Sequence, residues 1–214
     1  MKVAILSESP ADEAAIRILA DAVLGIKTSP VSHVGLRERG WPSVRSVFPT
    51  VLKQLHYHGD AEGLIFVVDS NGAVVHQPGH ELPGKFEPRC RLCELRRIRD
   101  EVVSQLRLVA GKAKLKTAIG LAVPAIEAWL LCGTDAHVNK AAWITGQSNN
   151  AFPYTKIDLK KQLYGTERPS LGSETQHMTQ AAELLAANRS PLEKAFPSGF
   201  GAFARDLKLW QQPD

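Results

Sequence analysis

The chain has 214 residues, of which 44% are hydrophobic and 22% charged, and its net charge is +4. This balance is typical of a folded globular protein and excludes a disordered chain, a collagen-like repeat and a coiled-coil rod, while the length suits one large domain or a core with an appendage. No apolar run reaches the roughly 18 residues of a membrane span, and the N-terminal segment turns acidic where a signal peptide would stay apolar. We therefore expect a soluble, cytoplasmic protein without a membrane partner.

The first pattern along the chain predicts a strand, a turn and a helix. Residues 3–6 are a short apolar run, after which apolar residues recur with helical spacing. Ser9 is a natural N-cap, with Pro10 at the first helical position and Asp12 three residues after the cap. Gly25 marks the expected end of this helix.

Two further apolar runs, residues 63–68 and 117–123, predict buried strands, because both faces of each run are apolar. Residues 44–55 have helical periodicity, and Pro49 should kink this helix or make it start afresh. The short segment 31–34 is a candidate fourth strand. Pro124 is expected to open the helix that follows the run 117–123.

Alternating strands and amphipathic helices predict an α/β fold with a mostly parallel sheet flanked by helices. We assign this core to residues 1–132. Beyond it only helical patterns remain, so residues 133–214 are expected to form a helical C-terminal extension packed on the core. Three segments show the helical spacing most clearly: 157–164, 178–187 and 200–210.

Acidic residues follow each predicted strand: Glu8, Asp69 and Glu127. Ligands of parallel sheets bind beyond the carboxyl ends of the strands, and clustered carboxylates favour Mg²⁺ or Mn²⁺. Each acid also has a simpler explanation, since Glu8 and Glu127 suit a helix dipole and Asp69 could begin a turn with Asn71. No glycine-rich phosphate loop follows any strand, which weakens nucleotide-hydrolase and dehydrogenase interpretations.

These acidic segments resemble the topoisomerase-primase (TOPRIM) fold in its nuclease branch, near the overcoming-lysogenization-defect nucleases. The resemblance is carried by ESPADE at residues 8–13 and by VVDSN, which ends at Asn71. The segments AVPAIEAWLL at 122–131 and FPSGFGAF at 196–203 are similar to a compact bacterial TOPRIM-like family that is often considered with phage defence and mobile elements. The family pattern has glycine where Ser9 stands and a second aspartate where Asn71 stands.

The resemblance implies a Mg²⁺- or Mn²⁺-dependent nuclease that hydrolyses phosphodiester bonds, with a protein partner from a defence system as a further expectation. It assigns metal binding to Glu8, Asp69, Asn71 and Asp12, and catalysis to Glu8 and Asp69, to which we add Glu127. The neutral Asn71 implies weaker binding of Mg²⁺. Two alternatives remain open: a catalytically weakened module that binds nucleic acid or a protein partner, and a small-molecule phosphotransfer enzyme.

No tyrosine is expected at the strand ends, so hydrolysis is favoured over a covalent tyrosyl link. The chain has three tyrosines, and all of them lie outside the strand-tip segments: Tyr57, Tyr154 and Tyr164.

A second constellation lies in and after a long segment, residues 70–91, which is too long for a plain connection. It consists of His76, His80, Cys90 and Cys93, four side chains that suit a structural Zn²⁺. The alternative is free thiols and solvated imidazoles. Cys132 is distant in sequence and is expected in the core.

The segment 85–116 holds ten lysines and arginines against four acidic residues. A helix expected over 94–109 would bury its apolar face and carry arginines outward. Four of these arginines are candidates for gripping a DNA or RNA backbone: Arg96, Arg97, Arg99 and Arg107. The alternative is an ordinary solvated helix face, and phosphate contacts alone do not distinguish DNA from RNA.

Overall fold

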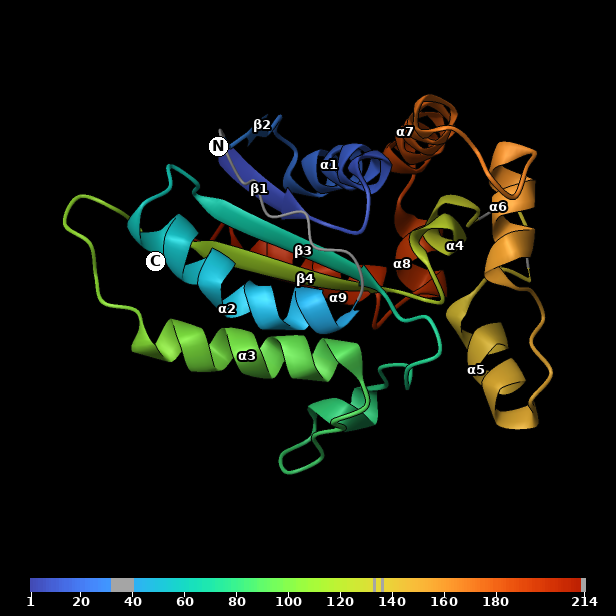
Figure 1. The fold of residues 1–214 in the computed structure, drawn as a ribbon, viewed down its shortest axis with the longest axis horizontal. Helices are drawn as coiled ribbons and strands as arrows, with labels where there is room; N and C mark the ends of the chain where they lie inside the picture. Colours follow the sequence, from blue (N-terminus) through green and yellow to red (C-terminus); the bar gives the residue numbers. More distant parts are fainter. Residues whose placement is uncertain (32–40, 133, 136, 213–214) are drawn as a thin grey trace.

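The computed structural model describes residues 1–31, 41–132, 134–135 and 137–212, with the backbone alone at 42 and 43. Its centre is a four-stranded, all-parallel sheet in the order β2-β1-β3-β4 (Figure 1). The strands are β1 (Lys2–Leu6), β2 (Ser29–Pro30), β3 (Gly63–Asp69) and β4 (Lys116–Ala122). The predicted α/β class, with helices around a parallel sheet, is confirmed.

The register brings the carboxyl ends of the three longer strands to one end of the sheet. Leu6 of β1 lies opposite Phe66 of β3, and Asp69 of β3 lies opposite Ala122 of β4. The strand β3 pairs with β1 on one side and with β4 on the other, and its apolar side chains are buried on both faces. Residues that directly follow Leu6, Asp69 and Ala122 are therefore neighbours in space.

Helices cover both faces of the sheet (Figure 1). The helix α1 (Pro10–Leu24) packs against β1, while α2 (Trp41–Tyr57) and α3 (Arg91–Gln105) pack against each other, and α3 also contacts β4. The expected start of α1 is confirmed, because Ser9 accepts a hydrogen bond from the backbone N–H of Asp12, whose carboxylate accepts one from the N–H of Ser9. Gly25 ends the helix in a left-handed conformation.

The C-terminal part is helical, as expected, and two of its helices make the largest contacts with the core. The long helix α7 (Leu171–Ala187) packs on α1, and α9 (Phe200–Leu209) packs on β4 and α1. The shorter helices are α4 (Ile126–Leu130), α5 (Lys140–Asn149), α6 (Lys156–Tyr164) and α8 (Ser190–Ala195). The rings of Trp129, Phe200 and Phe203 stack edge-on and face-on where α4 meets α9.

The structure adds detail to the sequence prediction at four elements. The helix expected over 94–109 is α3, which starts at Arg91 and ends at Gln105, because Leu106 is extended. Of the two outcomes expected at Pro49, a kink or a fresh start, the fresh start does not occur, since α2 runs through this residue. The extra strand is β2 at Ser29–Pro30, and residues 32–34 of the expected segment lie outside the described residues. The helix α5 was not anticipated.

Within the described residues, none of the helices is both long enough and apolar enough to cross a membrane.

Candidate functional site

The strand-tip cluster consists of Glu8, Asp12, Asp69, Asn71 and Glu127, and Asp69 lies at its centre. The Oδ1 atom of Asp69 accepts a hydrogen bond from the backbone N–H of Ile126 at 3.1 Å. Its Oδ2 atom accepts one from the ammonium of Lys156 at 2.6 Å. Both carboxylate oxygens of Asp69 therefore accept hydrogen bonds from residues that follow β4 in the chain, and one of the two donors, Lys156, is a cation.

Asn71 faces the same cation as Asp69. Its Oδ1 atom accepts a hydrogen bond from Lys156 Nζ at 2.7 Å, and its backbone N–H donates to the carbonyl of Pro124 at 3.0 Å. The backbone of Asn71 is left-handed, with φ of 49°, a conformation that asparagine tolerates better than most residues. The Asp-x-Asn pair thus holds one ammonium group between its two side chains.

The other three acids of the cluster repel Asp69. Burial and the charges of Asp69 and Glu127 together raise the pKa of Asp12 to about 8, against the hydrogen bonds with Ser9. Burial and Asp69 also raise the pKa of Glu8, although Lys156 and Arg91 oppose this shift. Glu127 is buried, and its pKa is raised for the same two reasons. All four predicted acids therefore lie in one electrostatic environment.

Three cations enter this environment that the sequence did not indicate. Lys156 lies at the start of α6, and Lys160, one turn later, lies 4.0 Å from Glu127. Arg91, the first residue of α3, donates from Nη1 to the backbone carbonyl of Asp69 at 2.7 Å. Arg91 belongs to the basic segment, but no spacing in the sequence links either lysine to Asp69.

Tyr164 corrects the expectation that no tyrosine approaches the strand ends. Its hydroxyl donates to Glu127 Oε1 at 3.4 Å, and its charge state is influenced by Asp12. Burial, followed by the charge of Glu127, raises the pKa of Tyr164 far above its usual value. The phenolate is therefore strongly disfavoured, which makes Tyr164 a hydrogen-bond donor and a poor nucleophile.

The His/Cys cluster, His76, His80, Cys90 and Cys93, is the second site. Cys93 Sγ lies 3.3 Å from His76 Nδ1 and 3.7 Å from His80 Nδ1, and Cys90 Sγ lies 3.5 Å from His76 Nδ1. All four ligand atoms lie within 4.8 Å of one another. Tetrahedral zinc with bonds of about 2.3 Å to sulfur and 2.0 Å to nitrogen would hold such atoms about 3.6 Å apart. The cluster can hold a metal ion.

The surroundings of the His/Cys cluster suit a buried ion. Burial lowers the pKa of His76 to about 4, so its imidazole is neutral at neutral pH, the form that binds metals. Burial also raises the pKa of Cys90 to about 12, so its thiolate needs a nearby cation. His76 Nε2 lies 3.2 Å from Glu81, which accepts a hydrogen bond from Arg96 at 2.8 Å. A carboxylate on the second nitrogen is the usual support of a metal-binding histidine.

The strand-tip carboxylates do not form a comparable group. In the part of the chain that the structure describes, the His/Cys cluster is the group of at least three such side chains whose ligand atoms come close enough to share one ion. Mutual repulsion and the ammonium of Lys156 dominate the strand-tip cluster instead. The start of α3 connects the two sites. Arg91, its first residue, lies between Cys90 and Cys93 in the chain, and its side chain donates a hydrogen bond to the backbone carbonyl of Asp69.

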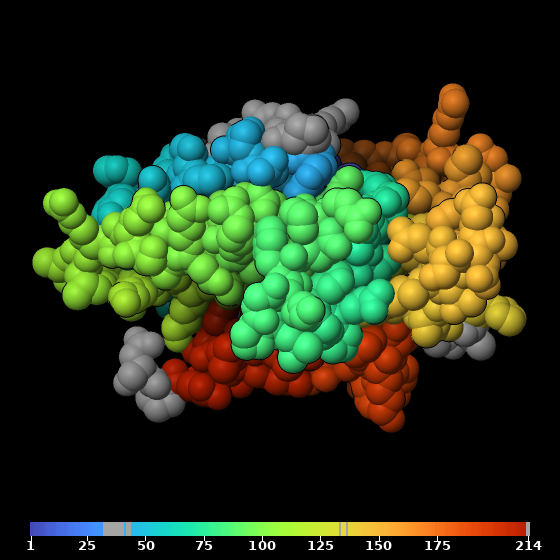
Figure 2. Space-filling view, turned by 90° about the horizontal axis from the view of Figure 1, so that it is seen from below, coloured from blue at the N-terminus to red at the C-terminus, as the bar shows by residue number. Residues whose placement is uncertain are grey.

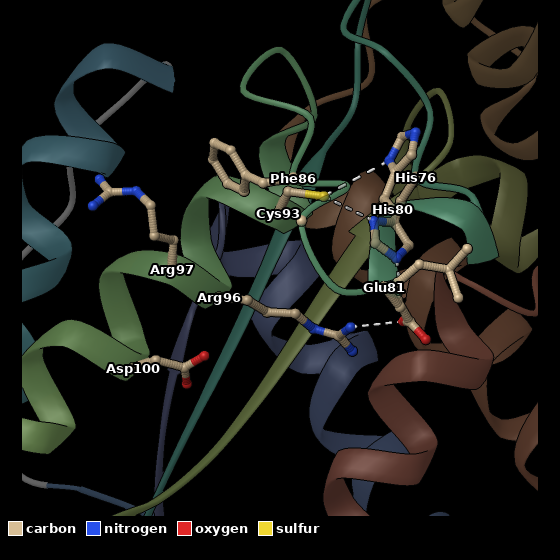
Figure 3. Close-up of a pocket in the computed structure, with 10 residues that line it drawn as sticks. His76, His80, Glu81, Phe86, Cys93, Arg96, Arg97 and Asp100 are labelled. Atoms are coloured by element: carbon tan, nitrogen blue, oxygen red, sulfur yellow. Dashed lines mark hydrogen bonds and ion pairs between the residues drawn. The ribbon is translucent and has the colours of Figure 1, made fainter.

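An open cavity of about 440 Å³ lies beside the His/Cys cluster (Figure 3). His80, Cys93, Phe86, Arg96 and Arg97 all contribute to its lining. The helix α3 and the segment before it lie together on one open face of the molecule (Figure 2). Phe86 is 46% exposed, so the cavity has an apolar side as well as a charged one.

Three of the four arginines predicted to grip nucleic acid are engaged by carboxylates. Arg96 pairs with Glu81 at 2.8 Å and Arg99 with Asp100 at 2.8 Å, while Arg97 contacts both Glu94 and Glu101. Arg107 lies beyond the end of α3, and its backbone N–H donates to the hydroxyl of Tyr57. These ion pairs reduce the positive charge that the outer face of α3 can offer to a phosphate.

Comparison with known proteins gives no match: neither a family model, nor a curated protein, nor a solved structure is significantly similar to this chain. The fold and the two sites define the protein as a parallel α/β protein with an acidic strand-tip cluster and a candidate metal centre.

Proposed function

We propose that the strand-tip cluster hydrolyses phosphodiester bonds of nucleic acid with the help of a divalent cation, as the resemblance to TOPRIM nucleases implies. The observation that carries this proposal is the convergence of Glu8, Asp12, Asp69 and Glu127 at the carboxyl ends of parallel strands. Acids whose pKa is raised by burial and by one another's charge gather at catalytic sites, because proton transfer needs such shifted pKa values.

Glu8, Asp12 and Glu127 would have to draw together to bind Mg²⁺ or Mn²⁺, because among the described residues their oxygens are not close enough to share one ion. These carboxylates offer oxygen ligands, whereas Asp69 and Asn71 are occupied by Lys156. A divalent ion, when bound, supplies positive charge for the phosphate and for the activation of water. The resident residues contribute positioning, because Lys156 and Arg91 hold the Asp69 segment in place. Without a bound ion, burial and the neighbouring acids raise the pKa of Asp12 to about 8, and an ion that Asp12 ligates would lower this pKa.

A second candidate function is binding of nucleic acid without cleavage. Lys156 neutralises Asp69, and its other partner is the neutral Asn71 where the family has an acid. Both features lower the negative charge that would hold a divalent ion. This arrangement favours a weakened site over a fully active one at low Mg²⁺ concentration.

The test is incubation of the purified protein with plasmid DNA, single-stranded DNA and RNA in Mg²⁺ and in Mn²⁺. Cleavage that is lost in Glu8→Gln and in Asp69→Asn supports the nuclease, with Glu183→Gln, an exposed acid on α7, as the control. Binding without cleavage under every condition supports the second candidate. Cleavage retained in both site variants would mean that the reaction takes place elsewhere or comes from a contaminant.

For the His/Cys cluster we propose a structural Zn²⁺. The argument rests on the ligand separations of 3.3 to 3.7 Å and on four protein ligands, which complete a tetrahedron and leave no position for a substrate. The surrounding loop has few buried residues of its own, so the ion would supply the order that apolar packing does not.

A further inference from the structure

Arg91 is placed between the two cysteines of the His/Cys cluster. Cys90 is the N-cap of α3, Arg91 is its first residue, and Cys93 follows within the first turn. Both cysteine side chains are buried against His76. An ion held by these sulfurs would fix the backbone on each side of Arg91, whose own side chain points to the other site.

The guanidinium of Arg91 lies at the strand-tip cluster and is held there by two contacts. It donates to the carbonyl of Asp69 at 2.7 Å and lies over the ring of Trp41, 5.0 Å from the ring centre. Its charge interacts with Glu8 and Asp69. Stacking and a backbone hydrogen bond fix the orientation of the group without neutralising it.

The bonding of Arg91 differs from that of the arginines further along α3. Arg96, Arg97 and Arg99 each contact a carboxylate, whereas no ion pair joins Arg91 to an acidic residue in the described parts of the chain. A guanidinium has five N–H donors, and the carbonyl of Asp69 takes one of them. Arg91 is half-buried, so donors remain for a ligand at the strand ends.

We propose that Arg91 binds the phosphate of the substrate at the strand-tip cluster and that the metal of the His/Cys cluster holds Arg91 in position for this contact. The inference rests on the proposed function, because it assigns the ligand class of the same site, a phosphodiester. The planar fork of arginine suits a phosphate better than a lysine does, since it offers two parallel hydrogen bonds. The proposal also gives the metal centre a role at the strand-tip cluster, although none of the residues of the His/Cys cluster belongs to the strand-tip cluster.

The experiment measures binding of fluorescein-labelled 12-nucleotide DNA and RNA strands by anisotropy, with the zinc-loaded protein in buffer without Mg²⁺. Arg91→Gln is expected to raise Kd at least tenfold and to lower the slope of log Kd against log salt by about 0.7, the value for one phosphate contact of a single strand. Arg91→Lys should keep the salt slope because it keeps the charge. Arg89→Gln, an exposed arginine two residues earlier that pairs with Glu87, is the matched control and should bind like the wild type.

The coupling to the metal is tested with His80→Ala, which removes the most exposed ligand and leaves the other three. This variant should weaken binding by a factor similar to that of Arg91→Gln, and the double variant should be less than twofold weaker than Arg91→Gln alone. Unchanged Kd in Arg91→Gln, or a wild type that binds neither strand, would overturn the assignment of Arg91. Multiplicative losses in the double variant would overturn the coupling. Failure of the nuclease proposal looks different, because the binding effects persist while no strand is cut.

Discussion

Asp12 serves two purposes that conflict as the pH changes. Its carboxylate completes the capping box of α1, accepting a hydrogen bond from the N–H of Ser9 at 2.9 Å. The same carboxylate is buried close to Asp69 and Glu127, and its pKa is raised to about 8. The protonated form is therefore favoured in the folded protein far above the pH at which an unfolded aspartate loses its proton.

This conflict predicts a loss of stability at alkaline pH. A raised pKa in the folded state contributes stability that is complete below about pH 4 and is lost as the pH rises through about 8. Without divalent ions, the free energy of unfolding should fall between pH 5.5 and 9 by at least about 1.4 kcal/mol, the equivalent of one pKa unit. Asp12→Asn keeps an oxygen for the cap and should lose clearly less, as measured by urea denaturation at both pH values.

The control for this prediction is Asp158→Asn. Asp158 has the same position in the capping box of α6, with Thr155 as N-cap, but it lies on the surface, and hydrogen bonds from Thr155 lower its pKa. The alkaline loss should persist in this variant. An Asp12→Asn protein with the full wild-type loss would show that Asp12 is not the group that titrates.

The acidic residues of the strand-tip cluster were predictable, and their cations were not. Glu8 and Asp69 follow apolar runs, and parallel strands bring such positions together whatever the helices do. Lys156 reaches Asp69 across 87 positions, through the packing of α4, α6 and α7. No local pattern encodes that packing. Arg91 is absent from the predicted site because the sequence predicts that its helix begins at residue 94, whereas α3 begins at Arg91.

At the scale of elements, the His/Cys cluster predicts how the segment before α3 responds to metal removal. The purified protein should contain about one zinc per chain, and chelation should speed hydrogen exchange in residues 70–93 while the sheet stays protected. The segment has one short 3₁₀ helix (Pro78–Glu81) with no buried residue, so packing alone holds it weakly. Exchange measured by mass spectrometry, with and without chelator, checks this expectation.

Two cysteines provide a matched pair for the same test. Cys93 and Cys132 are each 6% exposed, but Cys132 has no place in the cluster. Cys93→Ser should abolish zinc retention and loosen the segment, whereas Cys132→Ser should retain the ion and cost only the packing of one sulfur. Equal zinc content in both variants would exclude Cys93 as a ligand.

Elements with uniform apolar patterns were predictable, and α5 shows why others were not. The buried residues of α5 are Lys140, Trp143 and Gly146, which form no apolar stripe. Its position depends on the ring contacts of Trp143 with Phe152 and Tyr154 and on the N-cap Asn139. Sequence periodicity detects helices that pack through an apolar stripe, and α5 packs through one large ring.

At the scale of the whole molecule, the C-terminal helices depend on close approach to the sheet. A Cβ atom at Gly199, the N-cap of α9, would lie 2.6 Å from the carbonyl oxygen of Leu121. Gly199→Ala should therefore push α9 away from β4 and lower the free energy of unfolding by about 1 to 3 kcal/mol. Gly172→Ala in α7 meets no atom within 4 Å and should raise it by about 0.5 to 1 kcal/mol.

Thermal or urea denaturation of both glycine variants measures the two effects under identical conditions. Equal stability changes in the two variants would mean that α9 can shift without loss and that its fit to β4 is loose. Gly201 in α9 lies further from its neighbours, so Gly201→Ala distinguishes the approach at Gly199 from a general effect of alanine in this helix.

The packing of α9 on β4 also affects how copies of the chain can associate. Since β4 is the last strand of the sheet, its outward backbone groups would be free to pair with a strand from another molecule. Asp206 instead accepts the N–H of Ile119, the indole of Trp210 donates to the carbonyl of Thr117, and Gly199 lies against Leu121. These contacts fall on every second residue of β4. An edge strand exposes its unpaired N–H and C=O groups at the same spacing, so these are the groups with which a strand from another molecule would pair. At the other side of the sheet, β2 has two residues in the part of the chain that the structure describes. The contacts with α9 and Trp210 therefore protect the β4 edge against pairing with another strand, so association through this edge would first require α9 to move away.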